Sequence, residues 1–524
     1  MINTALERLR LGIDVGGTNT DAALLFGKEV VATAKSHTTA DVRSGVIEVV
    51  TRILERSGVR RDAIEAVMIG TTQFANAFVQ RRDLAEVAVL RVSLPKGDGV
   101  PPLAGWPDDA ARAVGEHIYM VGGGSYYTGQ DYAQLDEEAI RRAALDARAR
   151  DLRTVAISAN FAPIRPDLEH RARDIVRAVM PDALITISSE VGGIGLIDRE
   201  SAAIINASLA GLGLKIVRSL ESAFRDLSIN APIFISQNDG TLLTTETAAL
   251  LPILTCSAGP TNSIRGAAFL TGLPDAIVVD IGGTTTDVGF VMGGFPRETT
   301  AANYIGGVRT NFRMPDVLSI GLGGGSRVRC IEGNWKVGPD SVGFRLVEDS
   351  QIFGGSELTA TDLAVRAGLA TIGDPSRVGH ISQATVDAAL ENIQLQIEDA
   401  IDQVKVSPAP LPLLLVGGGN IIVARPLRGA AEMLRPPHAE VANAIGAAIA
   451  LVSGRVDKLY DVPTLGREVA LQMAKEDARA AAVSAGANAD QVEIVEIIEL
   501  PMTHMRKGAT QIKVRAVGPL AALV

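Results

Sequence analysis

One phrase occurs twice in this chain and constrains its fold more than any other feature. The copies are Asp-Val-Gly-Gly-Thr-Asn-Thr-Asp at 14–21 and Asp-Ile-Gly-Gly-Thr-Thr-Thr-Asp at 280–287, so the second lies 266 positions after the first. Apolar runs flank each copy, and each copy therefore predicts two strands joined by a tight Gly-Gly turn. The tip of such a hairpin offers backbone N–H groups and hydroxyls to an anion. Two copies predict two similar half-domains that enclose one phosphate chain.

Charge and cysteine content narrow the class of protein. Of the 524 residues 47% are hydrophobic, and the formal net charge is −10, which leaves no cationic surplus for general binding of nucleic acid or anionic membranes. The two cysteines, Cys256 and Cys330, are expected to be reduced thiols. The N-terminal residues lack the apolar core of a signal peptide, and no apolar stretch has the length and continuity of a membrane span. We therefore expect a cytoplasmic protein.

Strand-like apolar runs alternate with helical patterns along most of the chain. Such runs are found at 66–70, 87–92, 154–159, 276–280 and 411–416. This alternation predicts an α/β fold. We expect two related half-domains around a nucleotide cleft, at 1–192 and 193–458, and a small α+β appendage at 459–524.

The first phrase predicts a loop for the phosphates of a nucleotide. Asp14 is expected to hold Mg²⁺ through water, because Mg²⁺ prefers oxygen ligands and keeps several of its waters. The residues expected to bind the nucleotide are Gly16, Gly17, Thr18, Asn19 and Thr20. A plain hairpin is the alternative, since Gly-Gly turns are common. The phrase has neither the Gly-Lys-Ser/Thr of a Walker loop nor the glycine spacing of a Rossmann fingerprint.

The second phrase favours the nucleotide over the plain hairpin, because chance recurrence of so long a pattern is rare. Asp280 is expected to approach the same Mg²⁺ from the other side, again through water. Asp287 is a third candidate catalytic carboxylate, whereas we expect its counterpart Asp21 to fix the first hairpin. The nucleotide-binding candidates of this copy are Gly282, Gly283, Thr284, Thr285 and Thr286.

A third glycine cluster follows the apolar run 411–416. Its residues are Gly417, Gly418, Gly419 and Asn420. They are expected to bind the base and ribose, because absent side chains let a ring lie against the backbone. The alternative is a tight turn between the strand and a helix near Arg425.

In this order the three elements resemble the phosphate-1, phosphate-2 and adenosine motifs of the superfamily of actin, sugar-kinase and heat-shock-chaperone ATPases. Three other segments are more specific, at 70–77, 256–260 and 320–326. They read Gly-Thr-Thr-Gln-Phe-Ala-Asn-Ala, Cys-Ser-Ala-Gly-Pro and Ile-Gly-Leu-Gly-Gly-Gly-Ser. With them the chain resembles the hydantoinase/oxoprolinase family, and within it the short branch of the A-type subunit, over about residues 10–455. The resemblance implies actin-like (ribonuclease-H-like) half-domains.

The same resemblance implies an enzyme that uses ATP and Mg²⁺ to open a cyclic amide such as a hydantoin, 5-oxoproline or a lactam. ATP would phosphorylate the carbonyl oxygen, and water would then open the ring. A B-type partner subunit, and hence a hetero-oligomer, is also implied. Two other functions stay open: an ATP-dependent ketone carboxylase subunit of the same family, and a non-enzymatic ATPase that uses the cleft as a switch. A sugar kinase is a weaker fourth choice.

Two of the specific segments add candidate site residues. Thr71, Thr72 and Asn76 are expected to bind substrate or phosphate, with a helix N-cap by either threonine as an equal alternative. The glycine-rich loop contains Gly323, Gly324, Gly325 and Ser326. It is expected to bind phosphate at a helix N-terminus, with a close-packed turn as the alternative.

The chain departs from many relatives at two positions. Asn19 stands where they have an aromatic residue, and Ile69 stands where they have histidine. These departures leave the substrate open. The six histidines show no His-Glu-x-x-His or Cys/His spacing, so a zinc site is not expected.

Overall fold

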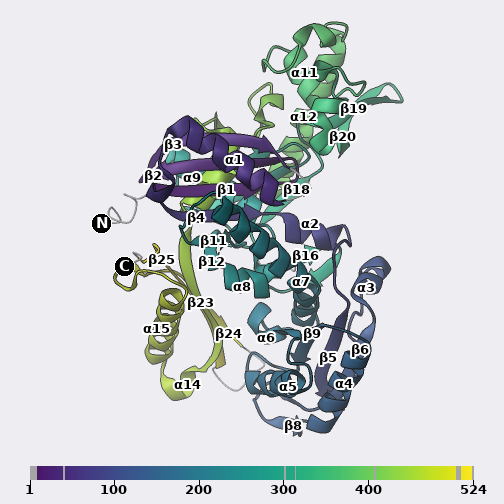
Figure 1. Ribbon diagram of the computed structural model, residues 1–524, viewed down its shortest axis with the longest axis vertical. Helices are drawn as coiled ribbons and strands as arrows, with labels where there is room; N and C mark the ends of the chain where they lie inside the picture. Colours follow the sequence, from purple (N-terminus) through teal and green to yellow (C-terminus); the bar gives the residue numbers. More distant parts are fainter. Residues whose placement is uncertain are drawn as a thin grey trace.

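The computed structural model describes residues 9–38, 42–299, 303–312, 314–405, 407, 409–502 and 509–521. Three sheets of four or more strands carry helices on their faces (Figure 1). The α/β fold expected from the sequence is therefore confirmed. Cys256 is buried, Cys330 is exposed, and both are free thiols.

The largest sheet carries the first hairpin. In sheet order its nine strands are β24 (Glu493–Pro501), β25 (Ala509–Gly518), β23 (Leu451–Asp461), β12 (Thr241–Thr244), β11 (Ile233–Ser236), β4 (Ile64–Thr71), β1 (Leu9–Val15), β2 (Asn19–Phe26) and β3 (Glu29–His37). β1, β4 and β11 are parallel neighbours, so their carboxyl ends share one edge of the sheet. β1 and β2 form the hairpin of the first phrase, and Asp14 pairs with Asp21 across it.

This sheet joins segments from distant parts of the chain. β11 follows the boundary expected at 192/193 and pairs with β4, which precedes it. β12 pairs with β23, more than 200 residues further along the chain. β25 pairs with β23 along its whole length, and β24 pairs with β25, so the strands beyond 458/459 extend the same sheet. α15 (Arg467–Ser484) packs on β23 and β25. The division of the chain at these two positions stays a prediction.

Different helices cover the two faces of this sheet. They are α1 (Val42–Ser57) and α7 (Leu196–Asp226) on one face, and α9 (Ala258–Thr271) and α13 (Ala442–Ala448) on the other. The alternation of side chains along β2 explains both contacts, since Leu24 belongs to the core with α1 and α7 whereas Leu25 faces α13. Both faces of the strand are apolar because both are covered.

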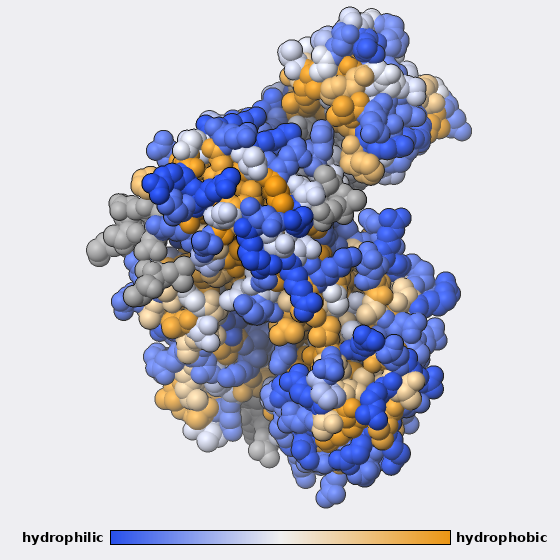
Figure 2. Space-filling view, viewed as in Figure 1, coloured by the Kyte–Doolittle hydropathy of each residue, from blue (hydrophilic) through white to orange (hydrophobic). Residues whose placement is uncertain are grey.

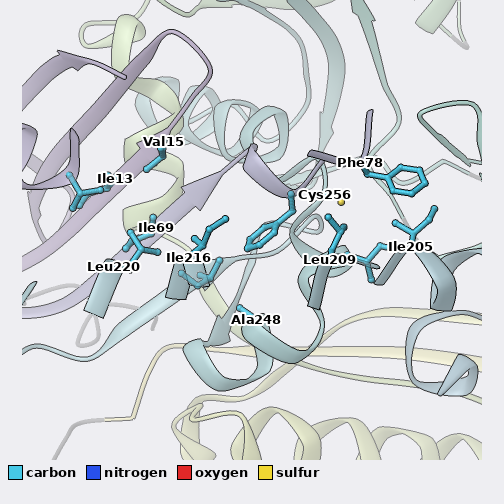
Figure 3. Close-up of a cluster of buried hydrophobic side chains, with 14 of the residues drawn as sticks. Ile13, Val15, Ile69, Phe78, Ile205, Leu209, Ile216, Leu220, Ala248 and Cys256 are labelled. Carbon is cyan, nitrogen blue, oxygen red and sulfur yellow. The ribbon is translucent and has the colours of Figure 1, made fainter. Parts of the chain in front are cut away.

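The 31-residue helix α7 belongs to the core that covers one face of the largest sheet. Figure 3 shows Ile216 and Leu220 of α7 in one cluster with Ile13 of β1 and Ile69 of β4. By length and composition α7 could cross a membrane, but 67% of its most apolar window is buried inside the protein. Burial of this extent is ordinary for a core helix.

A second sheet carries the second hairpin. Its strands are β15 (Phe295–Pro296), β14 (Thr286–Met292), β13 (Ala276–Ile281), β21 (Leu411–Val416) and β22 (Ala430–Leu434) in sheet order, with β18 (Val317–Ile320) paired to β14. α9 packs on one face, and α11 (Ala360–Arg366) and α12 (Gln383–Val404) pack on the other.

α9 and α13 lie between the two large sheets and touch at glycines. A Cβ atom on Gly266 would lie 1.8 Å from the carbonyl oxygen of Ala442, and one on Gly446 would lie 1.9 Å from that of Asn262. Only glycine allows backbones to approach so closely. This crossing holds the two hairpin-bearing sheets together.

The third sheet is parallel and forms a separate lobe. Its order is β10 (Leu184–Ile187), β9 (Thr154–Ala159), β5 (Val87–Leu94) and β6 (His117–Gly122), and α4 (Glu137–Ala149) and α5 (Pro166–Val179) cover it. The remaining elements are short: β7 (Gly124–Ser125), β8 (Asp131–Ala133), β16 (Asn303–Ile305), β17 (Val308–Thr310), β19 (Ser326–Ile331), β20 (Asn334–Ser341), α2 (Gln73–Val79), α3 (Asp108–Val114), α6 (Ser188–Val191), α8 (Thr245–Leu250), α10 (Leu346–Asp349) and α14 (Val462–Leu465).

Candidate functional site

The two copies of the repeated phrase form the same hairpin. The N–H of Gly16 donates to the carbonyl oxygen of Asn19 at 3.0 Å, and the N–H of Gly282 donates to that of Thr285 at 2.8 Å. Asp280 pairs with Asp287 across β13 and β14, as Asp14 pairs with Asp21 across β1 and β2. The sequence repeat is therefore a structural repeat.

The tips of the two hairpins lie against each other. A Cβ atom on Gly283 would be 3.1 Å from Oγ1 of Thr18. Gly17 and Thr285 are exposed at the tips, whereas Thr20 and Thr286 are buried. Thr286 donates its hydroxyl to the carbonyl oxygen of Leu322 at 2.7 Å. The tips therefore present glycines and exposed or half-buried hydroxyls, while the buried threonines hold the hairpins in place.

Asp14 and Asp280 lie at the strand ends that lead into the two hairpin tips, and the carboxylate of Asp14 is buried whereas that of Asp280 is half-buried. Asp14 is 3% exposed, and burial, together with Asp21 and Asp280, raises its pKa to about 7. Burial also raises the pKa of Asp280, and a hydrogen bond from Ser263 opposes that shift. Among the described residues Oδ1 of Asp14 has no hydrogen-bond partner. A cation bound here would relieve the repulsion between these carboxylates.

Asp287 and Asp21 occupy matching positions on the outgoing strands but differ in their partners. Burial, and then Asp280, raises the pKa of Asp287 to about 7, although the Ser319 hydroxyl donates to it at 2.5 Å. Asp21 lies 3.2 Å from Nζ of Lys35. Burial raises the pKa of Asp21, and Lys35 opposes the shift.

Lys35 was not among the residues singled out from the sequence. It pairs with Asp21 across β2 and β3, and Nζ also donates to the carbonyl oxygen of Glu440 at 3.2 Å. A Cβ atom on Gly418 would lie 3.1 Å from the same Nζ. Lys35 could have been identified from the sequence, because it lies on the strand next to the first phrase and on the same face as Asp21.

Three further residues surround Asp14: Gly70, the first residue of the segment 70–77 noted in the sequence, and Asn262 and Asn443, which carry no sequence signal. Asn443 of α13 donates Nδ2 to Oδ2 of Asp14 at 2.9 Å. A Cβ atom on Gly70 would lie 2.5 Å from Oδ1 of Asp14 and 2.7 Å from Nδ2 of Asn262. Asn262 is fully buried, and neither polar atom of its side chain has a partner among the described residues. Unpaired buried polar atoms that converge on one point fit a polar ligand there.

The expected substrate loop lies at the carboxyl end of β4. Oγ1 of Thr71 accepts the N–H of Gln73 at 3.2 Å, at the start of α2. Asn76 donates Nδ2 to Oγ1 of Thr72 at 3.3 Å. A Cβ atom on Gly259, in the first turn of α9, would lie 3.2 Å from Cγ2 of Thr72. The loop therefore has contacts of the helix-start kind, and its role towards a substrate stays a prediction.

The glycine-rich loop before β19 packs against the second hairpin. The N–H groups of Gly324 and Gly325 donate to the carbonyl oxygens of Gly282 and Gly283 at 3.0 and 2.8 Å. The N–H of Gly323 donates to Oγ of Ser326 at 2.8 Å. These three donors are used inside the protein, so the loop braces the hairpin, and its expected contact with phosphate stays a prediction.

The turn expected to hold the adenosine follows β21 and lies against β13. Gly417 has φ of +84°, and a Cβ atom there would lie 2.2 Å from Oδ1 of Asp280. Gly419 donates its N–H to the carbonyl oxygen of Ile281 at 2.7 Å. A 3-10 turn at Asn420–Ile422 follows in place of a helix near Arg425. The structure thus brings this turn and both hairpins to one place.

Comparisons with known proteins agree with this architecture. Residues 10–180 match the family described as "Hydantoinase/oxoprolinase N-terminal region", and residues 199–371 match "Hydantoinase/oxoprolinase". The caprolactamase subunit alpha of Pseudomonas jessenii is 26% identical over 75% of this chain and 59% of its own length. The acetophenone carboxylase gamma subunit of Aromatoleum aromaticum is 25% identical over 68% of this chain and 53% of its own length. This chain thus spans between half and three-fifths of these relatives.

A solved structure shows the same fold. The crystal structure of ATP-dependent caprolactamase from Pseudomonas jessenii superposes with a TM-score of 0.77, covering 98% of this chain and 88% of that chain. Sequence identity over this superposition is 21%. The likeness therefore extends through the C-terminal strands, beyond the segments matched by the family.

Proposed function

Because the chain belongs to the hydantoinase/oxoprolinase family, we propose that it is the ATP-dependent subunit of an enzyme that opens a cyclic amide, such as a hydantoin, 5-oxoproline or a lactam. The contact between the two hairpin tips, at Thr18 and Gly283, is the observation that supports this most. Two facing loops of glycine and threonine, each preceded by a carboxylate, have the groups needed to bind a nucleoside triphosphate and its metal ion.

In this proposal the phosphates lie between the two hairpin tips, and the base and ribose lie at 417–420. The carbonyl oxygen of the cyclic amide attacks the γ-phosphorus, an O–P bond forms, and the bond to ADP breaks. Water then adds to the former carbonyl carbon, the C–N bond breaks, and phosphate leaves. The sum is ATP, water and cyclic amide converted to ADP, phosphate and the ring-opened acid, which is an amino acid from a lactam or 5-oxoproline and an N-carbamoyl amino acid from a hydantoin. Catalysis of the first step is mainly positioning and charge neutralisation.

The carboxylates fit Mg²⁺ held through water. Asp14 and Asp280 repel each other, and Oδ1 of Asp14 is buried without a partner among the described residues, so a hydrated cation between them satisfies both conditions. In the part of the chain that the structure describes, no three His, Cys, Asp or Glu side chains are grouped to bind a metal directly. Mg²⁺ supplies neutralisation of phosphate charge when bound. Asp287, on the outgoing strand of the second hairpin, is the third carboxylate that we assign to this catalytic site.

The relatives named above are subunits of larger enzymes, and we propose a B-type partner for this chain as well. The partner would receive the phosphorylated ring and complete the hydrolysis. Two free cysteines agree with assembly in the cytoplasm.

A second candidate function is an ATP-dependent carboxylase subunit that acts on a ketone. The similarity to the acetophenone carboxylase gamma subunit supports it. A ketone enolate oxygen and an amide oxygen are both phosphoryl acceptors, so the hairpin site serves either reaction.

Nucleotide hydrolysis by the purified chain, with Mg²⁺ and with or without a partner subunit, separates the two functions. We expect ADP release to increase with hydantoin, 5-oxoproline or a lactam. Stimulation only by a ketone with bicarbonate would replace the first function by the second. Hydrolysis that responds to neither would contradict both, and formation of a sugar phosphate would do so as well.

A further inference from the structure

A cavity opens between the largest sheet and the lobe of the third sheet. It has a volume of about 770 Å³, within the range of small-molecule pockets. Its walls come from β23 and β25 on one side and from α5, α6 and the segment after α6 on the other. Figure 2 shows the surface hollowed between the lobe that carries α15 and the lobe that carries α5.

The inner end of this cavity lies at the same sheet edge as Asp14. Asp14 pairs with Gly70 across β1 and β4, and Ile69 pairs with Ile235 across β4 and β11. Gln237 follows Ile235 by two residues and lines the cavity. Because neighbouring strands lie about 4.8 Å apart, β1 and β11 are about 10 Å apart at this edge.

A direct contact through α9 also joins the two places. Thr261 donates its hydroxyl to the carbonyl oxygen of Asn238 at 2.8 Å, and Asn238 lines the cavity. The next residue, Asn262, has its amide beside Asp14 and Gly70. Two consecutive residues of α9 therefore connect the wall of the cavity to the surroundings of Asp14.

Hydrogen bonds at the inner end determine which polar atom Gln237 presents. Thr241 donates its hydroxyl to Oδ1 of Asp239 at 2.6 Å, because a carboxylate can only accept. Burial favours the protonated form of Asp239, but Arg455 and Arg515 hold its pKa below the ordinary value, so it is ionised. The Thr241 oxygen must then accept its other hydrogen bonds.

Two groups supply those hydrogen bonds. Nε2 of Gln237 donates to Oγ1 of Thr241 at 2.6 Å and to Oγ of Ser453 at 3.3 Å, and Ser453 lies 2.7 Å from the same Thr241 oxygen. Nε2 of Gln237 therefore faces Thr241 and Ser453, which share one amide hydrogen, and Oε1 is the acceptor left to meet a ligand. Asp239 fixes this orientation through Thr241.

We propose that the inner end of this cavity binds the N–H of a neutral cyclic amide, with Oε1 of Gln237 as acceptor. This inference rests on the proposed function, since it assigns the substrate site to this cavity. Leu254, Phe312 and Val456 supply apolar wall for the methylenes of the ring.

Charged side chains of both signs line the cavity: Glu190, Asp457, Arg455, Lys458 and Lys513. Lys513 lies 3.3 Å from Asp457, and Arg455 forms an ion pair with the buried Asp239 behind the wall. Because these cations already have partners within the protein, a neutral N–H donor fits the inner end.

The test compares a lactam with its N-methyl derivative in wild type and Gln237→Met. Binding of caprolactam and N-methylcaprolactam to the full chain is measured by calorimetry, without ATP. We expect the substitution to weaken caprolactam binding about tenfold, the worth of one hydrogen bond, and to leave N-methylcaprolactam unchanged. Gln472→Met, on the exposed face of α15, is the matched control and leaves both affinities unchanged.

Three outcomes would overturn the site: no lactam binding by the wild type, no effect of Gln237→Met, or equal weakening of both ligands. If Gln237→Met does not fold, as judged by thermal melting, Gln237→Asn withdraws the oxygen by one methylene and is measured instead. ATP hydrolysis separates this inference from the proposed function. If a lactam stimulates ATP hydrolysis equally in wild type and Gln237→Met, the proposed function stands and the lactam site at Gln237 is wrong. If lactam binding depends on Gln237 but the lactam does not stimulate ATP hydrolysis, the site stands and the proposed function is wrong.

Discussion

Asn443 donates a hydrogen bond from Nδ2 to Oδ2 of Asp14 at 2.9 Å and thereby joins α13 to the carboxyl end of β1. Burial, Asp21 and Asp280 raise the pKa of Asp14 to about 7, and this hydrogen bond opposes them. The helix that packs between the two large sheets therefore also favours the ionised form of a carboxylate that we assign to the metal ion.

Asn443→Ala is expected to raise the pKa of Asp14 further, because the donor that favours the carboxylate is lost. In the protein without Mg²⁺ and nucleotide, the pH range over which Asp14 titrates then moves up. Unfolding free energy measured between about pH 5 and 9 without these ligands checks this, because stability falls as pH rises through the folded pKa of Asp14. Asn334→Ala, at an exposed strand end, serves as the control. An unshifted pH range in the Asn443 variant would contradict the assigned role.

Asp14→Asn is expected to stabilise the protein at alkaline pH while it removes activity. The folded pKa of about 7 lies above the ordinary 3.8, so the folded state binds a proton that the unfolded state has lost. The stability from this proton is complete below the unfolded pKa and is lost as pH rises through the folded pKa. Above about pH 8 the variant gains roughly 2–4 kcal/mol over wild type without nucleotide.

Thermal or urea unfolding of the ligand-free protein at acidic and alkaline pH measures this difference. The wild type should lose stability between pH 4 and 7 more steeply than Asp14→Asn. The pKa of Asp287 is also raised, so Asp287 adds equally to the slope of unfolding free energy against pH in both proteins. Identical slopes would mean that Asp14 titrates normally.

The hairpins could be predicted from the sequence because their information is local. A Gly-Gly turn between two apolar runs needs no distant partner, and the repeat placed Asp14 and Asp280 at matching positions in advance. The fold class followed for the same reason, since each strand and helix pattern lies within a short segment.

Strand partners and lone polar residues could not be predicted in this way. β25 pairs with β23 and β11 pairs with β4, but nothing in their apolar patterns distinguishes these partners from others. Asn262 and Asn443 lie on helices far along the chain from Asp14, and a single asparagine on a helix carries no signal of the carboxylate that it meets. Only the packing of α9 and α13 between the sheets brings them together.

Gly323→Ala is expected to displace the second hairpin, because a Cβ atom there would lie 2.6 Å from the backbone carbon of Gly283. Overpacking of this kind costs about 1–3 kcal/mol of unfolding free energy. The affinity for ATP should fall as well, since the loop braces the hairpin tip. Gly211→Ala in α7, where a Cβ atom would meet nothing within 4 Å, is the matched control and should stabilise by about 0.5–1 kcal/mol. Denaturant unfolding and nucleotide titration of both variants check this, and unaltered nucleotide affinity in Gly323→Ala would argue against the bracing role.

Asp280→Asn is expected to abolish ATP turnover and leave the fold intact. The substitution keeps the size of the side chain and its hydrogen bond with Ser263, but it removes the negative charge that we assign to the hydrated metal ion. Loss of one such electrostatic contact costs about 100-fold or more in turnover. Asp387→Asn, on the exposed face of α12, makes the same chemical change away from the site and should have wild-type turnover. ADP release and circular dichroism are measured on both variants, and the melting temperature of Asp280→Asn without nucleotide should not fall, because burial raises the pKa of the carboxylate that it replaces. Near-normal turnover by a folded Asp280→Asn variant would remove Asp280 from the metal site and leave Asp14 as its remaining candidate.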